Sequence, residues 1–155
     1  ELNVIGSGKL HEEMKNKSKL LGLNNNITWH GNIARDEVQK ILSLSHLHII
    51  TSLGEGNPTV IWEAMSKGIP TMTLDHCGMH DTICKKCGIK IPIQKYKEVV
   101  ENIGLKLNEV INNPQIITEL SKETISCAEK FSWKKRHIFF NKIYDDAIAN
   151  FNNKN

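Results

Sequence analysis

The stretch GEGNPTVIWEAMSKG, residues 54–68, decides how the fold and the function of this chain are interpreted. It carries two glutamates, Glu55 and Glu63, on either side of a Gly-Asn-Pro turn and the start of a predicted helix. The residues between and after them are mostly apolar. The presence of two carboxylates near the start of a mostly apolar helix suggests a chemical role for them.

The helix in this stretch offers an anion site. Asn57 and Pro58 suit the N-cap and the first helical position, and Gly68 suits the position just after the helix end. The first turn of a helix presents unpaired N–H groups and the positive end of the helix dipole. Gly56 lets a ligand approach the backbone closely because it has no Cβ. We therefore expect a diphosphate on the amides of residues 57–60.

The carboxylates suit hydroxyl groups better than phosphates, because like charges repel. Glu63 is suited to accept hydrogen bonds from a ribose 2′- and 3′-OH, and Glu55 could do the same for a second sugar. The pattern thus indicates a nucleotide sugar. From these residues alone a second interpretation stays open, in which Glu55 only favours the helix dipole and Glu63 is a solvated surface residue.

Composition narrows the class of protein. The chain has 155 residues, of which 39% are hydrophobic and 24% charged, with a formal net charge of +3. These values are ordinary for a soluble globular domain, and the dispersed charges do not call for nucleic acid. No apolar run approaches the roughly 20 residues that span a bilayer. Four cysteines without a signal peptide indicate reduced thiols and a cytoplasmic location.

Short strand-like runs alternate with helical segments along most of the chain. The predicted strands are LNVIGSG, ITWH, HLHIITS, IPTMTL and GIKIPI. Helices are expected over KLHEEMKNKSKLLG, over EVQKILSLS with Asp36 as cap, over 58–67, 96–112 and 114–130, and from 133 to about 150. This alternation predicts an α/β fold with a Rossmann-like parallel sheet, helices on both faces and additional C-terminal helices. Ligands bind such sheets at the carboxyl ends of the strands, where the glycines at 6, 8, 31, 54 and 56 fall.

The segment SLGEGNPTVIWEAMSKGIPTMT resembles the signature of family-four glycosyltransferases, retaining enzymes of the two-domain GT-B architecture. The similarity extends over VIGSGKL, ITWHGNI and FSW. The residues that match the signature are Ser52, Glu55, Gly56, Glu63, Ala64, Met65, Gly68 and Pro70. The resemblance implies that the chain is the C-terminal, donor-binding domain of such an enzyme.

The resemblance also implies roles for individual residues. Glu55 would contact the donor sugar and Glu63 the ribose. Three further groups are implied: diphosphate-binding backbone at Gly56, Asn57, Pro58 and Thr59, a base-side loop at Asn32 and Ile33, and a Gly-rich loop at Gly6, Ser7 and Gly8. The implied reaction transfers a hexosyl group from a nucleotide-diphosphate sugar with retention of anomeric configuration. It needs no metal and no other cofactor.

Some features depart from the family pattern. Asn57-Pro58 stands where many members have an aromatic-Gly pair, so the sugar subsite is expected to differ. Residues 1–150 are expected to form a partial domain truncated at its N-terminus. The acceptor domain and the phosphate-binding Arg and Lys would lie before Glu1, and 151–155 would be a disordered tail. We expect the strands in LNVIGSG and HLHIITS each to lack a neighbour, and the isolated chain to be marginally stable and inactive.

A cysteine- and histidine-rich segment, DHCGMHDTICKKCG at 75–88, is the other concentration of reactive side chains. A zinc site would use Cys77, His80, Cys84 and Cys87. The spacing does not match a paired zinc-binding pattern, so partly buried thiols with surface histidines are the favoured interpretation and a redox pair is a further alternative. In the favoured interpretation, His76, Gly78 and Met79 could still line the donor pocket.

Other conspicuous residues receive structural interpretations. His46 and His48 are expected to be packing or surface residues, and Trp29 and Trp62 core or interface residues. The basic run at 134–136 suits a solvated helix start, although it could attract the intact enzyme to anionic lipid at the inner face of the membrane.

The sequence therefore predicts half of a polysaccharide- or lipopolysaccharide-building glycosyltransferase. Its partners would be a nucleotide-sugar donor and a glycan or lipid-linked acceptor, without nucleic acid. Two alternatives remain: a non-catalytic nucleotide or sugar-phosphate binding module, and a zinc-stapled interaction domain.

Overall fold

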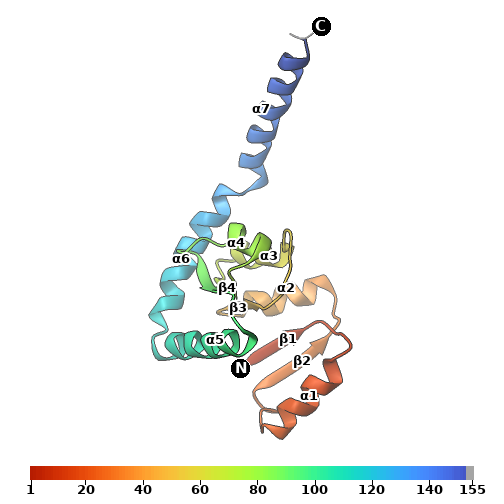
Figure 1. Ribbon diagram of the computed structural model, residues 1–155, viewed down its shortest axis with the longest axis vertical. Coiled ribbons are helices and arrows are strands. Elements are labelled where there is room, and N and C mark those ends of the chain that lie inside the picture. Colours follow the sequence, from red (N-terminus) through yellow and green to blue (C-terminus); the bar gives the residue numbers. More distant parts are fainter. Residues whose placement is uncertain (153–155) are drawn as a thin grey trace. The chain divides into compact units, whose positions relative to one another are not determined.

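The computed structural model describes residues 1–152, which alternate between strands and helices as expected for an α/β fold (Figure 1). The chain divides into two compact units, Glu1–Ser45 and His46–Asn155. The strands form two parallel sheets rather than one continuous sheet.

The first unit contains β1 (Leu2–Ile5), α1 (His11–Leu20), β2 (Ile27–Gly31) and α2 (Arg35–Ser43). Strands β1 and β2 pair in parallel, with a register shift at the end of β1. Helix α2 begins after Ala34, so the predicted cap Asp36 is wrong and lies in the first helical turn. An acidic residue there still interacts favourably with the positive end of the helix dipole.

The second unit begins with β3 (His48–Ile50), α3 (Thr59–Ser66), β4 (Thr71–Leu74), α4 (Cys77–Thr82) and β5 (Gly88–Ile91). It continues with α5 (Tyr96–Asn112), α6 (Gln115–Lys130) and α7 (Trp133–Asn152). The parallel sheet has the order β3-β4-β5. Its middle strand β4 is buried over its whole length, as expected for a strand covered by helices on a parallel sheet.

The core of the second unit lies around β4. Helices α3 and α4 contact β4, α5 contacts β5, and α6 contacts both α3 and α5. The buried cluster consists of Ile61, Met65, Met72, Leu74, Met79, Ile83, Cys87, Ile91 and Cys127. The α3–β4–α4 segment is therefore the best-packed part of the unit, and it carries the candidate site.

Helix α3 has nearly the predicted bounds. Pro58 rather than Asn57 is its N-cap, so the predicted start is wrong by one residue. Gly68 follows the end of α3 with φ +72°, as predicted. A Cβ at this position would lie 3.0 Å from the side chain of Ile125 on α6, so the glycine also permits the close α3–α6 packing.

Two predictions concern strand edges and the C-terminal helix. In the part of the chain that the structure describes, β1 and β3 each have one hydrogen-bonded neighbour, as expected. Helix α7 continues to Asn152, two residues further than predicted, and residues 153–155 of the predicted tail lie outside the described residues. None of the described α7 residues is buried. No helix among residues 1–152 has the length and hydropathy of a membrane span.

Candidate functional site

The loop that carries Glu55 is bound directly to helix α4. The backbone N–H of Gly78 donates a hydrogen bond to the carbonyl oxygen of Glu55 at 2.8 Å. Glu55 follows β3 and Gly78 lies in the helix that follows β4. Because β3 and β4 are parallel neighbours, their carboxyl ends meet at one edge of the sheet. The structure thus brings two predicted donor-side segments together at this edge.

Gly78 has no room for a side chain. A Cβ built on it would lie 1.9 Å from the carbonyl oxygen of Gly56 and 2.7 Å from that of Glu55. The preceding residue, Cys77, has φ +48°, a conformation that non-glycine residues rarely adopt. Together these features bring the start of α4 into backbone contact with the Glu55–Gly56 peptide, which fixes where that peptide lies.

The two glutamates flank the start of α3. Glu55 lies in the loop before the helix and Glu63 in its second turn, and both are partly exposed. The carbonyl oxygen of Glu63 accepts a hydrogen bond from the Ser66 hydroxyl at 2.8 Å, which anchors the backbone at the end of the helix. One carboxylate therefore precedes the N-terminal end of α3, and the other lies within the helix.

The helix mouth itself is suited to an anion. Within the described residues no side chain caps α3, and its first turn carries no acidic residue. The side chain of Asn57 is instead held by Trp62, whose Nε1–H donates to Oδ1 at 2.8 Å. The first turn of α3 therefore offers its N–H groups and the positive end of the helix dipole without a capping side chain or a carboxylate of its own.

Trp62 connects this loop to the start of α7. Its ring lies 5.1 Å from that of Phe131, and the guanidinium of Arg136 lies 5.1 Å from the Trp62 centroid. Trp62 is half-buried, which agrees with the prediction that it is a core or interface residue. In the first unit Trp29 likewise packs edge-on against His11 at 5.4 Å.

The predicted Gly-rich and base-side loops meet in the first unit. The N–H of Gly6 donates to the carbonyl oxygen of Gly31 at 2.8 Å, so both loops leave the same edge of the β1–β2 pair. Gly6 and Gly31 have φ +109° and +63°, which glycine adopts without strain. The residues that follow, Ser7, Gly8 and Asn32, are exposed, and Ile33 is half-buried.

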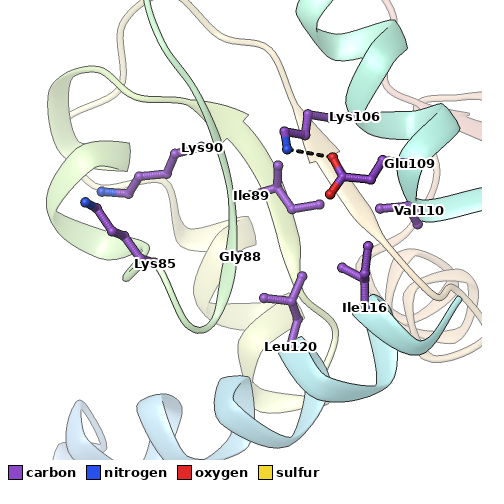
Figure 2. Close-up of a pocket in the computed structure, with 9 residues that line it drawn as sticks. All are labelled: Lys85, Gly88, Ile89, Lys90, Lys106, Glu109, Val110, Ile116 and Leu120. Atoms are coloured by element: carbon purple, nitrogen blue, oxygen red, sulfur yellow. Dashed lines mark hydrogen bonds and ion pairs between the residues drawn. The ribbon is translucent and has the colours of Figure 1, made fainter. Parts of the chain in front are cut away.

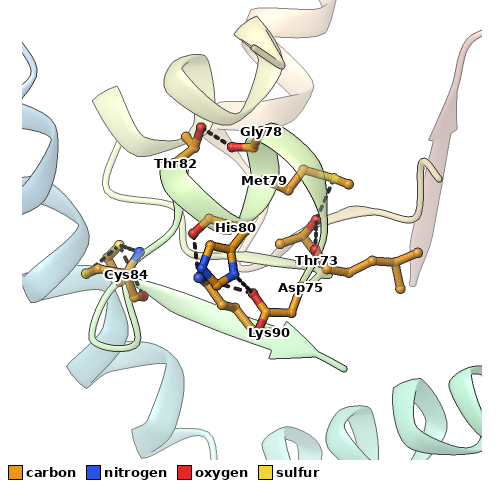
Figure 3. A network of polar contacts seen from close by, with 10 residues as sticks. Thr73, Asp75, Gly78, Met79, His80, Thr82, Cys84 and Lys90 are labelled. Carbon is orange, nitrogen blue, oxygen red and sulfur yellow. Dashed lines mark hydrogen bonds and ion pairs between the residues drawn. The ribbon is translucent and has the colours of Figure 1, made fainter. Parts of the chain in front are cut away.

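A charged network lies at the ends of β4 and β5 (Figure 3). Asp75 Oδ1 lies 2.7 Å from His80 Nδ1 and 3.3 Å from Lys90 Nζ. Burial raises the pKa of Asp75, but hydrogen bonds from His80 and Lys90 and the charge of Lys90 outweigh it and hold the pKa below its ordinary value. Lys90 also donates to the carbonyl oxygen of His80. The network ties α4 to the carboxyl ends of the strands.

The four residues of the less favoured zinc alternative, Cys77, His80, Cys84 and Cys87, do not converge among the described residues. His80 is engaged by Asp75, and Cys77 is exposed. Among the described residues the side chains that do converge are Cys84, Cys87 and Cys127, whose Sγ atoms all lie within 4.8 Å of one another. Cys127 lies on α6, so the sequence spacing alone gave no sign of it.

The three thiols perturb one another. Burial raises the pKa of Cys84, but hydrogen bonds from Cys87 and Cys127 and from backbone N–H groups outweigh it, so the pKa is lowered. Burial, reinforced by Cys84, raises the pKa of Cys87 and of Cys127. A single buried thiol would show only the second effect.

A separate pocket of about 270 Å³ lies between β5, α5 and α6 (Figure 2). Ile89, Val110, Ile116 and Leu120 form its apolar wall, and a Lys106–Glu109 ion pair borders it. It contains none of the predicted donor-site residues. We therefore regard it as a packing depression between helices and not as the donor site.

Sequence reasoning also missed helix α4 and the role of Gly78. From the sequence, His76, Gly78 and Met79 are expected only to line the donor pocket, and the structure forms a helix there from Cys77 to Thr82. The available signal was a glycine four positions after the last residue of β4. His46 and His48 were both predicted to be packing or surface residues. His46 is exposed, whereas His48 lies half-buried beside Thr71, and burial lowers the pKa of His48.

The chain is similar to known proteins in sequence and in fold. The family model described as "Glycosyl transferases group 1" matches residues 1–131. An uncharacterized glycosyltransferase of Haemophilus influenzae is 26% identical over 137 residues, which cover 86% of this chain and 37% of that protein.

Two solved structures are similar in fold. The lipopolysaccharide outer core galactosyltransferase WaaB, in its apo form, matches with a TM-score of 0.76 and 24% identity over 94% of this chain and 41% of its own. The Anabaena protein HepE, in complex with UDP and glucose, matches with a TM-score of 0.71 and 18% identity over 96% and 40%. The chain thus spans about two fifths of the length of these proteins.

Proposed function

Because the chain belongs to the glycosyl transferases group 1 family, a family of GT-B-type enzymes, we propose that it supplies the donor-binding half of a hexosyltransferase. The proposed donor is a nucleotide-diphosphate sugar. The observation that supports this most directly is the backbone contact between the Glu55–Gly56 peptide and Gly78, beside the uncapped mouth of α3.

The diphosphate would bind at the start of α3. The amides of Thr59 and its neighbours and the positive end of the helix dipole favour a dianionic group there. Pro58 contributes no N–H, but it fixes the extended entry into the helix at φ −70°. The hydrogen bond from Trp62 keeps the Asn57 side chain from competing for the first-turn amides.

The sugars would bind at the two ends of this anion site. Glu63, one to two turns into α3, would accept hydrogen bonds from the ribose hydroxyls. Glu55, before the helix, would accept them from the donor hexose. Charge-assisted hydrogen bonds from hydroxyls to carboxylates are stronger than neutral ones and are directional, so they suit the recognition of vicinal hydroxyls.

The chemistry would be transfer of the hexosyl group with retention of anomeric configuration. In this proposal the helix mouth stabilises the negative charge that develops on the leaving diphosphate, and no metal ion is required. The acceptor would be a glycan or a lipid-linked glycan. The name of the similar galactosyltransferase supports an acceptor of the lipopolysaccharide type.

The proposal also includes a cytoplasmic location, as expected from the reduced thiols. The Lys134–Arg136 run could attract the intact protein to anionic lipid at the inner face of the membrane, although the Arg136 side chain is engaged by Trp62 and Phe131.

The test is binding of donors to the intact protein. A calorimetric titration with UDP-glucose, UDP-galactose, UDP-N-acetylglucosamine, GDP-mannose and ADP-glucose should reveal one preferred donor. Glu63→Ala should weaken that binding. Glu119→Ala, which removes an exposed carboxylate on α6, should leave it unchanged.

Two results would reject the proposal. One is the absence of binding to every donor in the panel, and the other is equal affinity of the wild-type and Glu63→Ala proteins. Binding of the donor without transfer to any lipopolysaccharide or glycan acceptor would instead support the non-catalytic module, which uses the same site.

A further inference from the structure

The three cysteines Cys84, Cys87 and Cys127 form a cluster that the donor site does not use. The Sγ atoms of Cys84 and Cys87 are 2.9 Å apart, and those of Cys84 and Cys127 are 3.2 Å apart. Cys87 and Cys127 are buried, whereas Cys84 is exposed (Figure 3 shows its position after α4). The cluster therefore has a closed side and one side that solvent reaches.

The backbone around the cluster is held independently of the sulfur atoms. The Thr124 hydroxyl on α6 donates to the carbonyl oxygen of Cys87 at 3.0 Å, and Thr124 is fully buried. Cys127 follows Thr124 by three positions and so lies on the same face of α6. The N–H of Cys87 donates a hydrogen bond to the carbonyl oxygen of Cys84, which closes the turn between these two residues. The convergence of the three thiols is thus built into the packing of α6 on this turn.

From this geometry we propose that Cys84, Cys87 and Cys127 bind a soft, thiophilic metal ion, Zn²⁺ or Cu⁺. Thiolates are the ligands that both ions prefer. Three sulfur atoms at about 2.3 Å from a tetrahedral zinc ion lie about 3.8 Å from one another. Two of the observed Sγ–Sγ distances are 2.9 and 3.2 Å and all three are within 4.8 Å, so the two short contacts would have to widen by about 0.6–0.9 Å. Cu⁺ could be held by the three thiolates alone, and Zn²⁺ would take a water or a small thiol from the exposed side of Cys84.

The surrounding charges suit such a centre. Three thiolates and one of these cations leave a net negative charge, which a buried site cannot hold without compensation. Lys85 and Lys86 lie within the Cys84–Cys87 turn, and Lys130 follows Cys127 on α6. Amide N–H groups stabilise thiolates as well, and the N–H of Cys84 donates to Cys87 Sγ at 3.2 Å.

A disulfide explains the cluster less well. It would join two sulfur atoms at about 2.05 Å and leave the third thiol beside it without a function. Both short contacts involve Cys84, so neither partner is singled out. A metal ion would use all three sulfur atoms. It would hold α6 against the turn that precedes β5.

The experiment is metal binding by the full chain, prepared under reducing conditions and freed of metal by chelation. Zn²⁺ and Cu⁺ are each added, excess metal is removed against a weak chelator, and the retained metal is measured by mass spectrometry. Co²⁺ is used as a spectroscopic probe, because thiolate ligands give it an intense charge-transfer band. Four variants are compared with the wild type: Cys84→Ser, Cys87→Ser, Cys127→Ser and the matched control Cys77→Ser, which changes an exposed cysteine outside the cluster.

We expect about one equivalent of Zn²⁺ or of Cu⁺ and a clear cobalt band in the wild type and in Cys77→Ser, and a loss of at least tenfold in affinity in the cluster variants. Cys84→Ser changes an exposed side chain, so its loss of binding is interpretable even if Cys127→Ser misfolds. Three results would overturn the proposal: wild type with four titratable thiols but no retained metal, binding that is lost in Cys77→Ser and kept in Cys127→Ser, or a natively purified chain with only two titratable thiols, as a disulfide requires.

Discussion

The amide of Gly78 is bonded to the carbonyl oxygen of Glu55, and no side chain larger than hydrogen fits between their segments. The contact joins the loops after two neighbouring parallel strands, so the position of the Glu55 loop depends on the position of α4. The Asp75–His80–Lys90 network holds α4 in turn against β4 and β5. If the donor sugar binds at Glu55 as proposed, its recognition depends on the position of α4 and therefore on the Asp75–His80–Lys90 network.

The first prediction concerns this close packing. Gly78→Ala places a methyl group within 1.9 Å of the Gly56 carbonyl oxygen, so the loop or the helix must move. We expect the free energy of unfolding to fall by about 1–3 kcal/mol, as for other overpacked sites, and donor binding to weaken as well. Urea unfolding and donor titration measure the two effects.

Gly104→Ala is the matched control, because Gly104 lies within α5 with open space around its Cβ position. It should raise the free energy of unfolding by about 0.5–1 kcal/mol through helix propensity alone. If Gly78→Ala were as stable as the wild type, the contact between α4 and the Glu55 loop would not exist in solution.

The second prediction concerns the pH dependence of stability at Asp75. The pKa of Asp75 is lower in the folded state than its ordinary value of 3.8, because burial is outweighed by hydrogen bonds from His80 and Lys90. The carboxylate therefore stabilises the fold above the unfolded-state pKa, and this stabilisation disappears as the pH falls through the lower folded-state pKa. Asp75→Asn should be less stable than wild type at neutral pH, and the difference should shrink below about pH 4.

Denaturant unfolding at several pH values measures this difference. Asp146→Asn, an exposed change on α7, should show no comparable convergence with the wild type. A gap between wild type and Asp75→Asn that stayed constant down to strongly acidic pH would contradict the role of the network.

The order of the secondary structure could be predicted because each element carries its own local signal. The strands are short apolar runs that end at turn residues, and α3 is marked by Pro58 before it and Gly68 after it. Helix α4 could not be predicted. It has six residues, includes a glycine and begins with a residue at φ +48°, so its formation depends on contacts with the Glu55 loop rather than on propensity.

The parts of the candidate sites formed by contiguous residues could be predicted from the sequence. The parts formed by residues far apart in the sequence could not. Glu55, Gly56 and the start of α3 are contiguous, so sequence reasoning reached them. Cys127 lies 43 positions from Cys84, and its approach depends on how α6 packs in the folded chain. The division of the strands into two sheets is long-range in the same sense, because strand pairing leaves no mark within the individual strands.

The third prediction concerns the contact that docks α6. Thr124→Val keeps the shape of the side chain but removes the hydroxyl, whose single proton is shared between the carbonyl oxygens of Cys87 at 3.0 Å and Leu120 at 2.7 Å. Because the site is buried, the loss should cost about 1–3 kcal/mol of unfolding free energy. Thr124→Ser should restore most of it. Thr118→Val, an exposed change on the same helix, should stay within about 0.5 kcal/mol of wild type in urea unfolding.

The last prediction separates the roles proposed for the two glutamates. If Glu63 binds the ribose, Glu63→Ala removes an interaction that the nucleoside diphosphate and the nucleotide sugar share, so both should bind about 10- to 100-fold more weakly, the loss expected for hydrogen bonds to a charged group. If Glu55 binds the hexose, Glu55→Ala should weaken only the nucleotide sugar. Calorimetry with the nucleoside diphosphate and the nucleotide sugar on the wild type and both variants measures the six affinities. Equal losses for both ligands in Glu55→Ala would mean that Glu55 acts on the loop and the diphosphate, and the assignment of the hexose subsite would have to be abandoned.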